Sequence, residues 1–280
     1  MLAVLDRGGV HATLTAIAWS QLACELAILT ILWRVWSRRA ALWFLILGTP
    51  MLLFPFPYAR IDLVSVLLAI GGAALVRRRR ATAGGAVIGL AILAKVWPYA
   101  IAPVLLFDRT RRGRRGVVAL LGVLAVGGLG WVAWAGTDGP GQVLSFRGAH
   151  GWQIESLPGS IAHALDPHAS VFEAGAWRSG AGMSAIARIV LLAATLAIVA
   201  WAWWRASRTD TDRTEDATGL AAALAIVAVL VLAPILSTQY VLWLLPFAAI
   251  VAATGDRWTG ALTIVIAALS TAGLAWIHQL

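Results

Sequence analysis

The chain has 280 residues, of which 60% are hydrophobic and only 12% are charged, and its mean hydropathy is +0.83. Because about a quarter of a soluble domain is charged, this composition excludes an ordinary soluble protein and predicts an integral membrane protein. The charges gather in clusters, separated by apolar runs of about 15 to 25 residues, a length that crosses hydrocarbon. Backbone amides in hydrocarbon must be satisfied within their own segment, so these runs are helices and the expected fold is all-α.

The net charge of +9 comes from arginine, since Lys95 is the only lysine among 22 basic residues. Most of the arginines cluster between apolar runs: Arg34, Arg38 and Arg39; Arg77 to Arg80; Arg109, Arg111, Arg112, Arg114 and Arg115; Arg205, Arg208 and Arg213; and Arg257. An excess of basic residues marks cytoplasmic loops. These clusters therefore predict the orientation of the chain and contacts with membrane lipids. No folded basic domain is indicated, so no nucleic-acid partner is expected.

The apolar runs predict about ten membrane segments in a single integral membrane domain, 1–280. They cover 12–33, 41–57, 62–76, 81–107, 116–136, 184–204, 218–235, 241–254 and 259–277. The run 81–107 is flanked by basic clusters on both sides and is too short for two crossings of ~20 residues each. It is either one crossing that breaks the charge rule or two short helices hinged near Lys95 and Pro98. The hinged pair is the favoured prediction.

The longest loop, 137–183, is expected to be extracytoplasmic, and the polar loop 205–217 is expected to be cytoplasmic. This topology places the N-terminus outside with no targeting segment before it, from which we expect that upstream helices are missing. All five histidines fall on the outer side, so chemistry is expected there. The spacing of His150, His163 and His168 matches no standard zinc pattern, and no metal site is predicted.

Lys95 lies within an apolar run, beside Trp97 and Pro98. An ionisable residue inside a membrane is costly and is therefore a candidate functional residue. Its ammonium group is suited to an anionic lipid phosphate, which it would bind as a point charge. The alternative is a lysine that snorkels from the end of a helix.

Arg60 and Asp62 lie where one predicted segment turns into the next. Asp62 is either the N-cap of the following helix, with Arg60 as an interfacial anchor, or both line the mouth of an outer cavity. In the second case one would bind phosphate and the other a sugar hydroxyl. Gln21 and Glu25 share a helical face and predict a hydrogen-bonding pair between helices, the alternative being that Glu25 is a functional acid.

The outer loop contains a polar and aromatic stretch between Phe146 and Ser156. Such a stretch suits a carbohydrate site, because an indole face stacks on a sugar while amide and carboxylate groups bind hydroxyls. Trp152, Gln153 and Glu155 supply these groups.

Several short motifs in this order resemble glycosyltransferase family 87, over roughly residues 40 to 255. They are Arg60–Leu63, Ala83–Gly85, Leu90–Pro98, Gly151–Ser156, Leu236–Tyr240 and Leu242–Pro246. His150 stands where the family motif has arginine, and Thr238 stands where it has proline. Members are bacterial membrane mannosyltransferases of the GT-C fold. Their catalytic carboxylate usually lies in a first outer loop that has no counterpart in this sequence.

The resemblance implies a multi-pass enzyme of the bacterial plasma membrane that moves mannose from a polyprenyl-phosphate sugar to a glycolipid or cell-envelope acceptor, without a cofactor. A carboxylate would take the acceptor proton, and cations would stabilise the departing phosphate. The expected site residues are Asp62 and Glu155 for catalysis; Lys95, Arg60 and Arg147 for the donor phosphate; and His150, Trp152, Gln153, Gln239 and Tyr240 for the sugar or acceptor. The alternatives are a transporter or lipid flippase, or a non-catalytic remnant.

Overall fold

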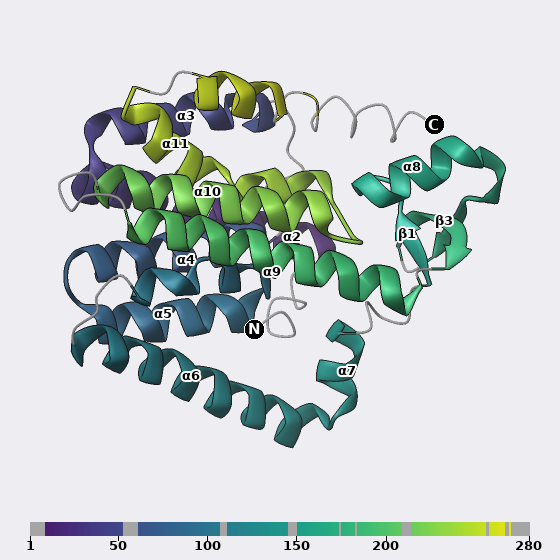
Figure 1. The fold of residues 1–280 in the computed structure, drawn as a ribbon, viewed down its shortest axis with the longest axis horizontal. Helices are drawn as coiled ribbons and strands as arrows, with labels where there is room; N and C mark the ends of the chain where they lie inside the picture. Colours follow the sequence, from purple (N-terminus) through teal and green to yellow (C-terminus); the bar gives the residue numbers. More distant parts are fainter. Residues whose placement is uncertain are drawn as a thin grey trace.

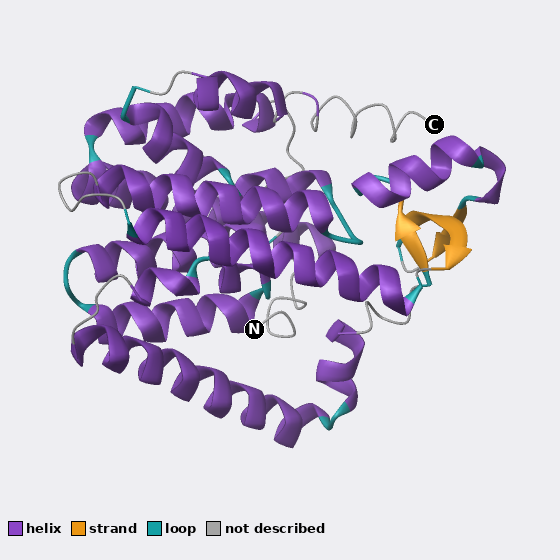
Figure 2. Ribbon diagram, viewed as in Figure 1, coloured by secondary structure: helices purple, strands orange, loops and turns teal. Residues whose placement is uncertain are grey.

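The computed structural model describes residues 9–52, 61–106, 111–144, 150–173, 175–182, 184–208, 214–255, 258–266 and 269. Most of these residues are helical (Figures 1 and 2). Within the described ranges, three helices are long and apolar enough to cross a membrane: Ala12–Trp36, Arg111–Ala135 and Ala185–Ser207. Shorter apolar helices cover Ala81–Ala94, Trp97–Leu106 and Thr218–Leu232. The prediction of a mainly helical membrane protein is thus confirmed, whereas the number of about ten membrane segments stays a prediction.

The long helices lie side by side, with α6 along one edge of the bundle and α3 with α11 along the opposite edge (Figure 1). In chain order the helices are α2 (Gly9–Ile31), α3 (Arg38–Leu52), α4 (Asp62–Arg77), α5 (Ala81–Ala94), α6 (Arg111–Ala135), α7 (Asp138–Leu144), α8 (Leu157–Leu165), α9 (Ala185–Ser207), α10 (Thr214–Leu232) and α11 (Leu245–Ala253). A π-helix, Leu32–Trp36, extends α2, and short 3-10 helices cover Trp97–Ala100, Ala102–Leu106, Pro167–Ala169 and Thr238–Trp243.

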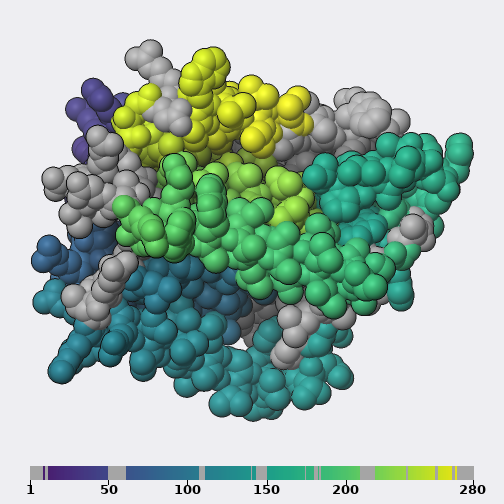
Figure 3. Space-filling model, in the orientation of Figure 1, coloured from purple at the N-terminus to yellow at the C-terminus, as the bar shows by residue number. Residues whose placement is uncertain are grey.

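Helices α6 and α9 form much of the face seen in Figure 3, and both direct large apolar side chains outward. The exposed apolar residues include Val118, Leu121, Val126 and Leu129 on α6 and Ile186, Ile189, Val190 and Leu192 on α9. Such a surface would be unstable in water but is the expected one against lipid chains. The exposed faces therefore agree with the membrane assignment made from hydropathy.

Glycines allow α4, α5 and α6 to pack at very short distances. A Cβ atom on Gly72 would lie 2.5 Å from Cγ1 of Ile88, and a Cβ on Gly85 would lie 1.9 Å from the carbonyl oxygen of Gly116. Small residues let helix backbones approach closely where no hydrophobic effect drives their association. The glycines of this region therefore set the spacing of the three helices.

The segment 81–107 breaks at Lys95, as the hinged pair predicted. Helix α5 ends at Ala94, and Lys95 has an extended backbone with φ −161° and ψ 136°. Pro98 lies in the 3-10 helix that follows. Pro98 has no N–H to donate to the carbonyl of Ala94, and its ring would clash with that carbonyl in a continuous helix, which accounts for the break.

After the break the chain turns back toward the start of α5. A Cβ on Gly116 would lie 2.7 Å from the carbonyl oxygen of Ala81 and 3.0 Å from Cδ2 of Leu105, so both ends of the segment meet beside α6. The basic clusters on either side of the segment consequently lie at one end of the bundle. Arg77 and Arg78 donate there to the carbonyl groups of Val35 and Arg34.

A small sheet lies at one end of the molecule, beside α8 (Figure 2). Its strands β1 (Gly151–Gln153), β2 (Val171–Glu173) and β3 (Ala176–Gly182) are antiparallel in the order β1-β3-β2. The prediction of an all-α fold is wrong in this region. Strands β2 and β3 are joined by a tight turn in which Gly175 has φ 79°, but β1 pairs with β3 from far away in the sequence. That pairing leaves no local sequence pattern.

Candidate functional site

Asp62 begins α4, at the end opposite the basic residue Arg77. The N-cap prediction for Asp62 is wrong, because Ile61 occupies the cap position and makes no side-chain cap hydrogen bond. Instead, Oε1 of the fully buried Gln21 on α2 accepts a hydrogen bond from the backbone N–H of Leu63, at 3.0 Å. The carboxylate of Asp62 is therefore directed to other partners.

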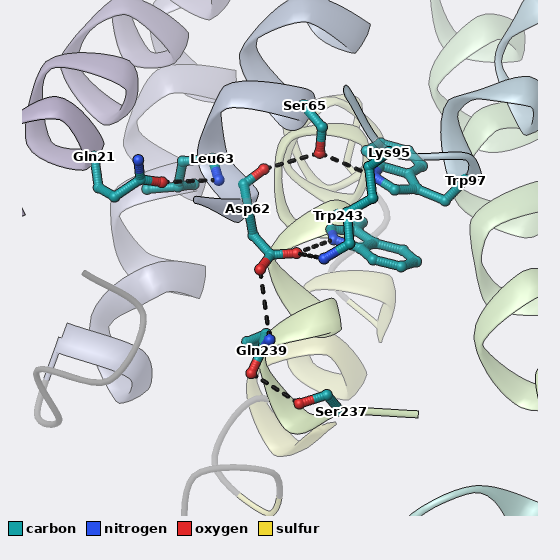
Figure 4. Close-up of polar contacts among 9 residues, drawn as sticks. All are labelled: Gln21, Asp62, Leu63, Ser65, Lys95, Trp97, Ser237, Gln239 and Trp243. Atoms are coloured by element: carbon teal, nitrogen blue, oxygen red, sulfur yellow. Dashed lines mark hydrogen bonds and ion pairs between the residues drawn. The ribbon is translucent and has the colours of Figure 1, made fainter. Parts of the chain in front are cut away.

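Three side chains from distant parts of the sequence surround the Asp62 carboxylate (Figure 4). Lys95 forms an ion pair and hydrogen bond with Oδ1. The indole Nε1 of Trp243 donates to the same oxygen at 3.0 Å, and Nε2 of Gln239 lies 3.5 Å from Oδ2. A buried carboxylate needs a countercharge and hydrogen-bond donors to offset its lost hydration, and this site provides both.

The two members of the ion pair differ in exposure: 30% of the Lys95 side chain is accessible but only 4% of the Asp62 side chain. The ammonium Nζ also lies over two aromatic faces, 4.4 Å from the ring centroid of Tyr240 and 5.0 Å from that of Trp243. Both are within the range of cation–π attraction. An anion that reaches this site would therefore meet Lys95 before Asp62.

Stacked aromatic rings form one wall of the site, which we call the aromatic stack (Trp97, Trp243 and Tyr240). The Trp97 and Trp243 rings are 5.1 Å apart at 8°, and the Tyr240 and Trp243 rings are 4.1 Å apart at 21°. Nε1 of Trp97 donates to Oγ of Ser65 at 3.1 Å, and Ser65 donates to the backbone carbonyl of Asp62 at 2.9 Å. The stack is thus tied to the first turn of α4.

Four of the residues predicted for the site come together here: Asp62, Lys95, Gln239 and Tyr240. The sequence prediction missed Trp243, Trp97 and Ser65, as well as Ser237, whose hydroxyl donates to Oε1 of Gln239 at 2.8 Å. Trp97 and Trp243 sit inside the motifs that carried the family resemblance. Tryptophan in a membrane helix is common enough, however, that position alone did not single them out. Arg60 and Arg147 lie outside the described residues.

The predicted outer-loop residues occupy the small sheet instead. Trp152 and Gln153 are in β1, where the backbone N–H of Trp152 donates to Oγ of Ser179. The exposed His150 contacts Glu173 through both its backbone N–H and its ring. A hydrogen bond links the sheet to the segment just before the site: the backbone N–H of Gln153 donates to the carbonyl of Pro234 at 3.2 Å. Pro234 lies three residues before Ser237.

Glu155, the second predicted catalytic carboxyl, is partly buried in this outer loop. Its Oε2 atom is buried and has no hydrogen-bond partner among the described residues. Burial raises the pKa of the Glu155 carboxyl, against the opposing effects of a backbone hydrogen bond, a hydrogen bond from Gln153 and the charge of Arg178. The folded loop therefore favours the protonated form of this side chain.

The Glu155→Gln variant should remove a pH dependence of the stability of the outer loop. Because the folded-state pKa of Glu155 is raised, the loop is most stable below its ordinary pKa of 4.5 and loses stability as the pH rises through the raised value. The variant should thus show stronger protection of 151–182 than the parent at pH 8 and similar protection at pH 5. Hydrogen exchange of peptides from this region, corrected for the intrinsic exchange rate, measures the difference.

The Glu173→Gln variant is a control with the opposite sign. Hydrogen bonds from His150 lower the pKa of the exposed Glu173 carboxyl, so its contribution is present at neutral pH and is lost as the pH falls. The Glu173→Gln variant should weaken protection at pH 8. An equal change in hydrogen-exchange protection in the two variants would contradict the raised pKa of Glu155.

Fold and site together define an integral membrane protein with a buried aspartate–lysine pair walled by aromatic rings. The family model of glycosyltransferase family 87 matches residues 2–238. The chain belongs to this family and is a membrane glycosyltransferase. The matched range includes Asp62, Lys95 and the outer loop, and it ends one residue before Gln239. Comparisons with curated proteins and with solved structures gave no match.

Proposed function

We propose that the chain transfers mannose from a polyprenyl-phosphate donor to a lipid-linked or cell-envelope acceptor, on the outer face of the bacterial plasma membrane. The family supplies the reaction class, and the Asp62–Lys95 pair supplies the main structural support for this donor. Lys95 offers a single, partly exposed positive charge, and Asp62 already balances it. This arrangement suits a singly charged phosphodiester better than a more highly charged nucleotide diphosphate.

The reaction we propose is a displacement at the anomeric carbon of the donor sugar. The acceptor oxygen forms a bond to this carbon while the bond to the phosphate oxygen breaks, and the bonding electrons leave with the lipid phosphate. Lys95 binds the departing phosphate and stabilises its growing negative charge. The acceptor hydroxyl gives its proton to the Asp62 carboxylate, which lies beside Lys95 and carries the negative charge that proton transfer requires.

The same pair also links donor binding to the proposed base. In the free protein the ammonium of Lys95 is paired with the carboxylate of Asp62. A phosphate that binds Lys95 takes over part of its charge. Donor binding would therefore loosen the ion pair and leave the Asp62 carboxylate available to the acceptor hydroxyl.

The outer loop is the proposed contact for the sugar or the acceptor. Its polar and aromatic residues Trp152, Gln153 and His150 lie in or next to β1. Strand β1 is hydrogen-bonded to Pro234, which precedes the segment that carries Gln239 and Tyr240. This hydrogen bond holds the outer loop next to the segment that carries the site residues Gln239 and Tyr240.

The proposal is tested with protein purified in detergent, labelled polyprenyl-phosphate mannose and a membrane lipid extract as acceptor. We expect transfer from this donor and none from a guanosine-diphosphate mannose of equal concentration. Lys95→Ala should weaken donor binding by about ten- to a hundredfold, the value of a charge-assisted hydrogen bond. Arg188→Ala, which removes an exposed cation near the start of α9, is the matched control and should bind the donor normally.

Three outcomes would contradict parts of the proposal. Transfer from the nucleotide sugar would show that the donor class is wrong. Donor binding without transfer to any acceptor would favour a non-catalytic remnant. Equal donor affinity in Lys95→Ala and the parent would remove Lys95 from the phosphate site.

A further inference from the structure

We propose that Trp243 is the positioning residue of this site, holding Asp62 and Lys95 in the geometry from which the sugar is transferred. The inference rests on the proposed function, in which Asp62 takes the proton and Lys95 binds the phosphate. Trp243 takes part in neither step. It nevertheless contacts both members of the pair, through two different parts of one side chain.

The edge of the indole fixes Asp62. Nε1 donates to Oδ1 at 3.0 Å, while Gln239 approaches the other oxygen only at 3.5 Å. A contact of 3.5 Å is at the limit of a hydrogen bond, so Trp243 is the stronger neutral donor to this carboxylate. An indole N–H is a donor only and cannot take the acceptor's proton. It can therefore orient the carboxylate without competing for its function.

The face of the same indole lies near Lys95. The ammonium is 5.0 Å from the Trp243 ring centroid and 4.4 Å from that of Tyr240. Tryptophan has the most favourable face for a cation among the aromatic side chains. The two rings hold the positive charge beside Asp62 without neutralising it, so that the charge stays available to a phosphate.

Local backbone geometry explains why Trp243 is rigid enough for this role. Tyr240 and Trp243 are three residues apart in the 3-10 helix Thr238–Trp243. A 3-10 helix has three residues per turn, so these side chains lie directly above one another, and their rings stack at 4.1 Å. The Trp97 ring also stacks on the indole, with the ring centroids 5.1 Å apart. Trp243 is thus stacked against two rings and is only 5% exposed.

The Trp243→Phe variant tests the hydrogen bond, since it keeps an aromatic ring in the stack but removes the N–H. Losing one buried hydrogen bond to a charged group should lower kcat by about ten- to a hundredfold and leave the KM for the donor within about threefold. The matched control is Trp203→Phe. Trp203 is also buried, at 4% exposure, and its Nε1 donates to a backbone carbonyl, that of Ala100, at 2.8 Å. Trp203→Phe should keep the parent kcat. The rates of both variants are divided by the amount of folded protein.

A conservative variant separates the two parts of the side chain. Trp243→His retains a ring N–H at the position of the indole Nε1 but lacks the large ring face. At pH 8, where histidine is mainly neutral, it should restore part of the kcat lost in Trp243→Phe. If Trp243→Phe and Trp203→Phe lower kcat to the same degree, or if Trp243→His is no better than Trp243→Phe, Trp243 has only a structural role and the inference is wrong.

A second readout does not depend on sugar transfer. Lys95 is the only lysine in the sequence, so an amine-reactive reagent has a single side-chain target, which mass spectrometry quantifies in its peptide. Replacing Trp243 by leucine removes both the N–H and the ring face and should raise the rate of Lys95 labelling several-fold over the parent. Trp203→Leu should not. If the parent protein transfers no sugar but these labelling rates differ as expected, the proposed function fails and the positioning role of Trp243 survives. Equal labelling rates overturn the inference itself.

Discussion

The Asp62→Asn variant should lose sugar transfer by a factor of a hundred or more, because the amide cannot accept the acceptor's proton and general-base catalysis contributes about 10²–10⁴ in rate. Asparagine has the size of aspartate and can still accept hydrogen bonds from Trp243 and Lys95 through its carbonyl oxygen. The loss should therefore fall on kcat and leave the amount of folded protein close to that of the parent. Rates of transfer from labelled donor, together with the elution profile in detergent, measure both quantities.

Asp166→Asn is the matched control for this substitution. Asp166 is an exposed aspartate of the outer loop, at the end of α8, and should tolerate the same change with full activity. A double substitution, Asp62→Asn with Lys95→Met, distinguishes a catalytic role from a purely structural ion pair. If the pair only stabilises the fold, restoring neutrality should restore activity. If the pair takes part in the reaction, as base and phosphate ligand, the double variant stays inactive.

The Gly85→Ala variant should disrupt the packing of α5 on α6 and so cause a large loss of stability from a single added methyl group. The new Cβ would lie 1.9 Å from the carbonyl oxygen of Gly116 and 2.7 Å from its carbonyl carbon, both backbone atoms that cannot rotate away. The helices must therefore separate. Overpacking typically costs about 1–3 kcal/mol, and a backbone clash of this kind belongs at or above the upper end of that range. Thermal denaturation followed by the loss of monodisperse protein on gel filtration measures the effect.

Gly122→Ala on the neighbouring α6 provides the control, because a Cβ there would have no atom within 4 Å. Alanine is a better helix former than glycine by ~1 kcal/mol, so this variant should be as stable as the parent or more so. The Gly85→Ala variant should also lose activity in whatever fraction remains folded, since α5 ends next to Lys95 and carries it toward Asp62. Similar melting temperatures for Gly85→Ala and Gly122→Ala would contradict the close contact of α5 and α6.

Much of the fold could be predicted from the sequence because the strongest determinants are local. Runs of apolar residues determined the positions of the membrane helices, since each helix satisfies its own backbone hydrogen bonds. The break at Lys95 could be predicted as well, because Pro98 and the two flanking basic clusters act over only a few residues. The order of short motifs further indicated the family, which the family model confirmed.

The assignments that failed depend on contacts between distant residues. Asp62 was a plausible N-cap by position, but its carboxylate turns toward Lys95, and Gln21 from another helix satisfies the N–H of Leu63. The sheet likewise arises from the pairing of β1 with a strand that follows after an intervening helix. Neither arrangement has a signature in the local pattern of residues, because the competing partner lies elsewhere in the chain.

Hydropathy and short motifs thus predict a helical membrane protein of glycosyltransferase family 87, and they single out Asp62, Lys95, Gln239 and Tyr240 as candidate site residues. The three-dimensional packing was needed to show that these four residues form one site. Asp62 and Lys95 are 33 residues apart, and Asp62 and Trp243 are 181 apart. The packing of helices brings them together: glycine contacts set the spacing of α4, α5 and α6, and the 3-10 helix then places Trp243 against the first turn of α4. Such packing depends on the shapes of several helices at once, which hydropathy and spacing along a single chain do not encode.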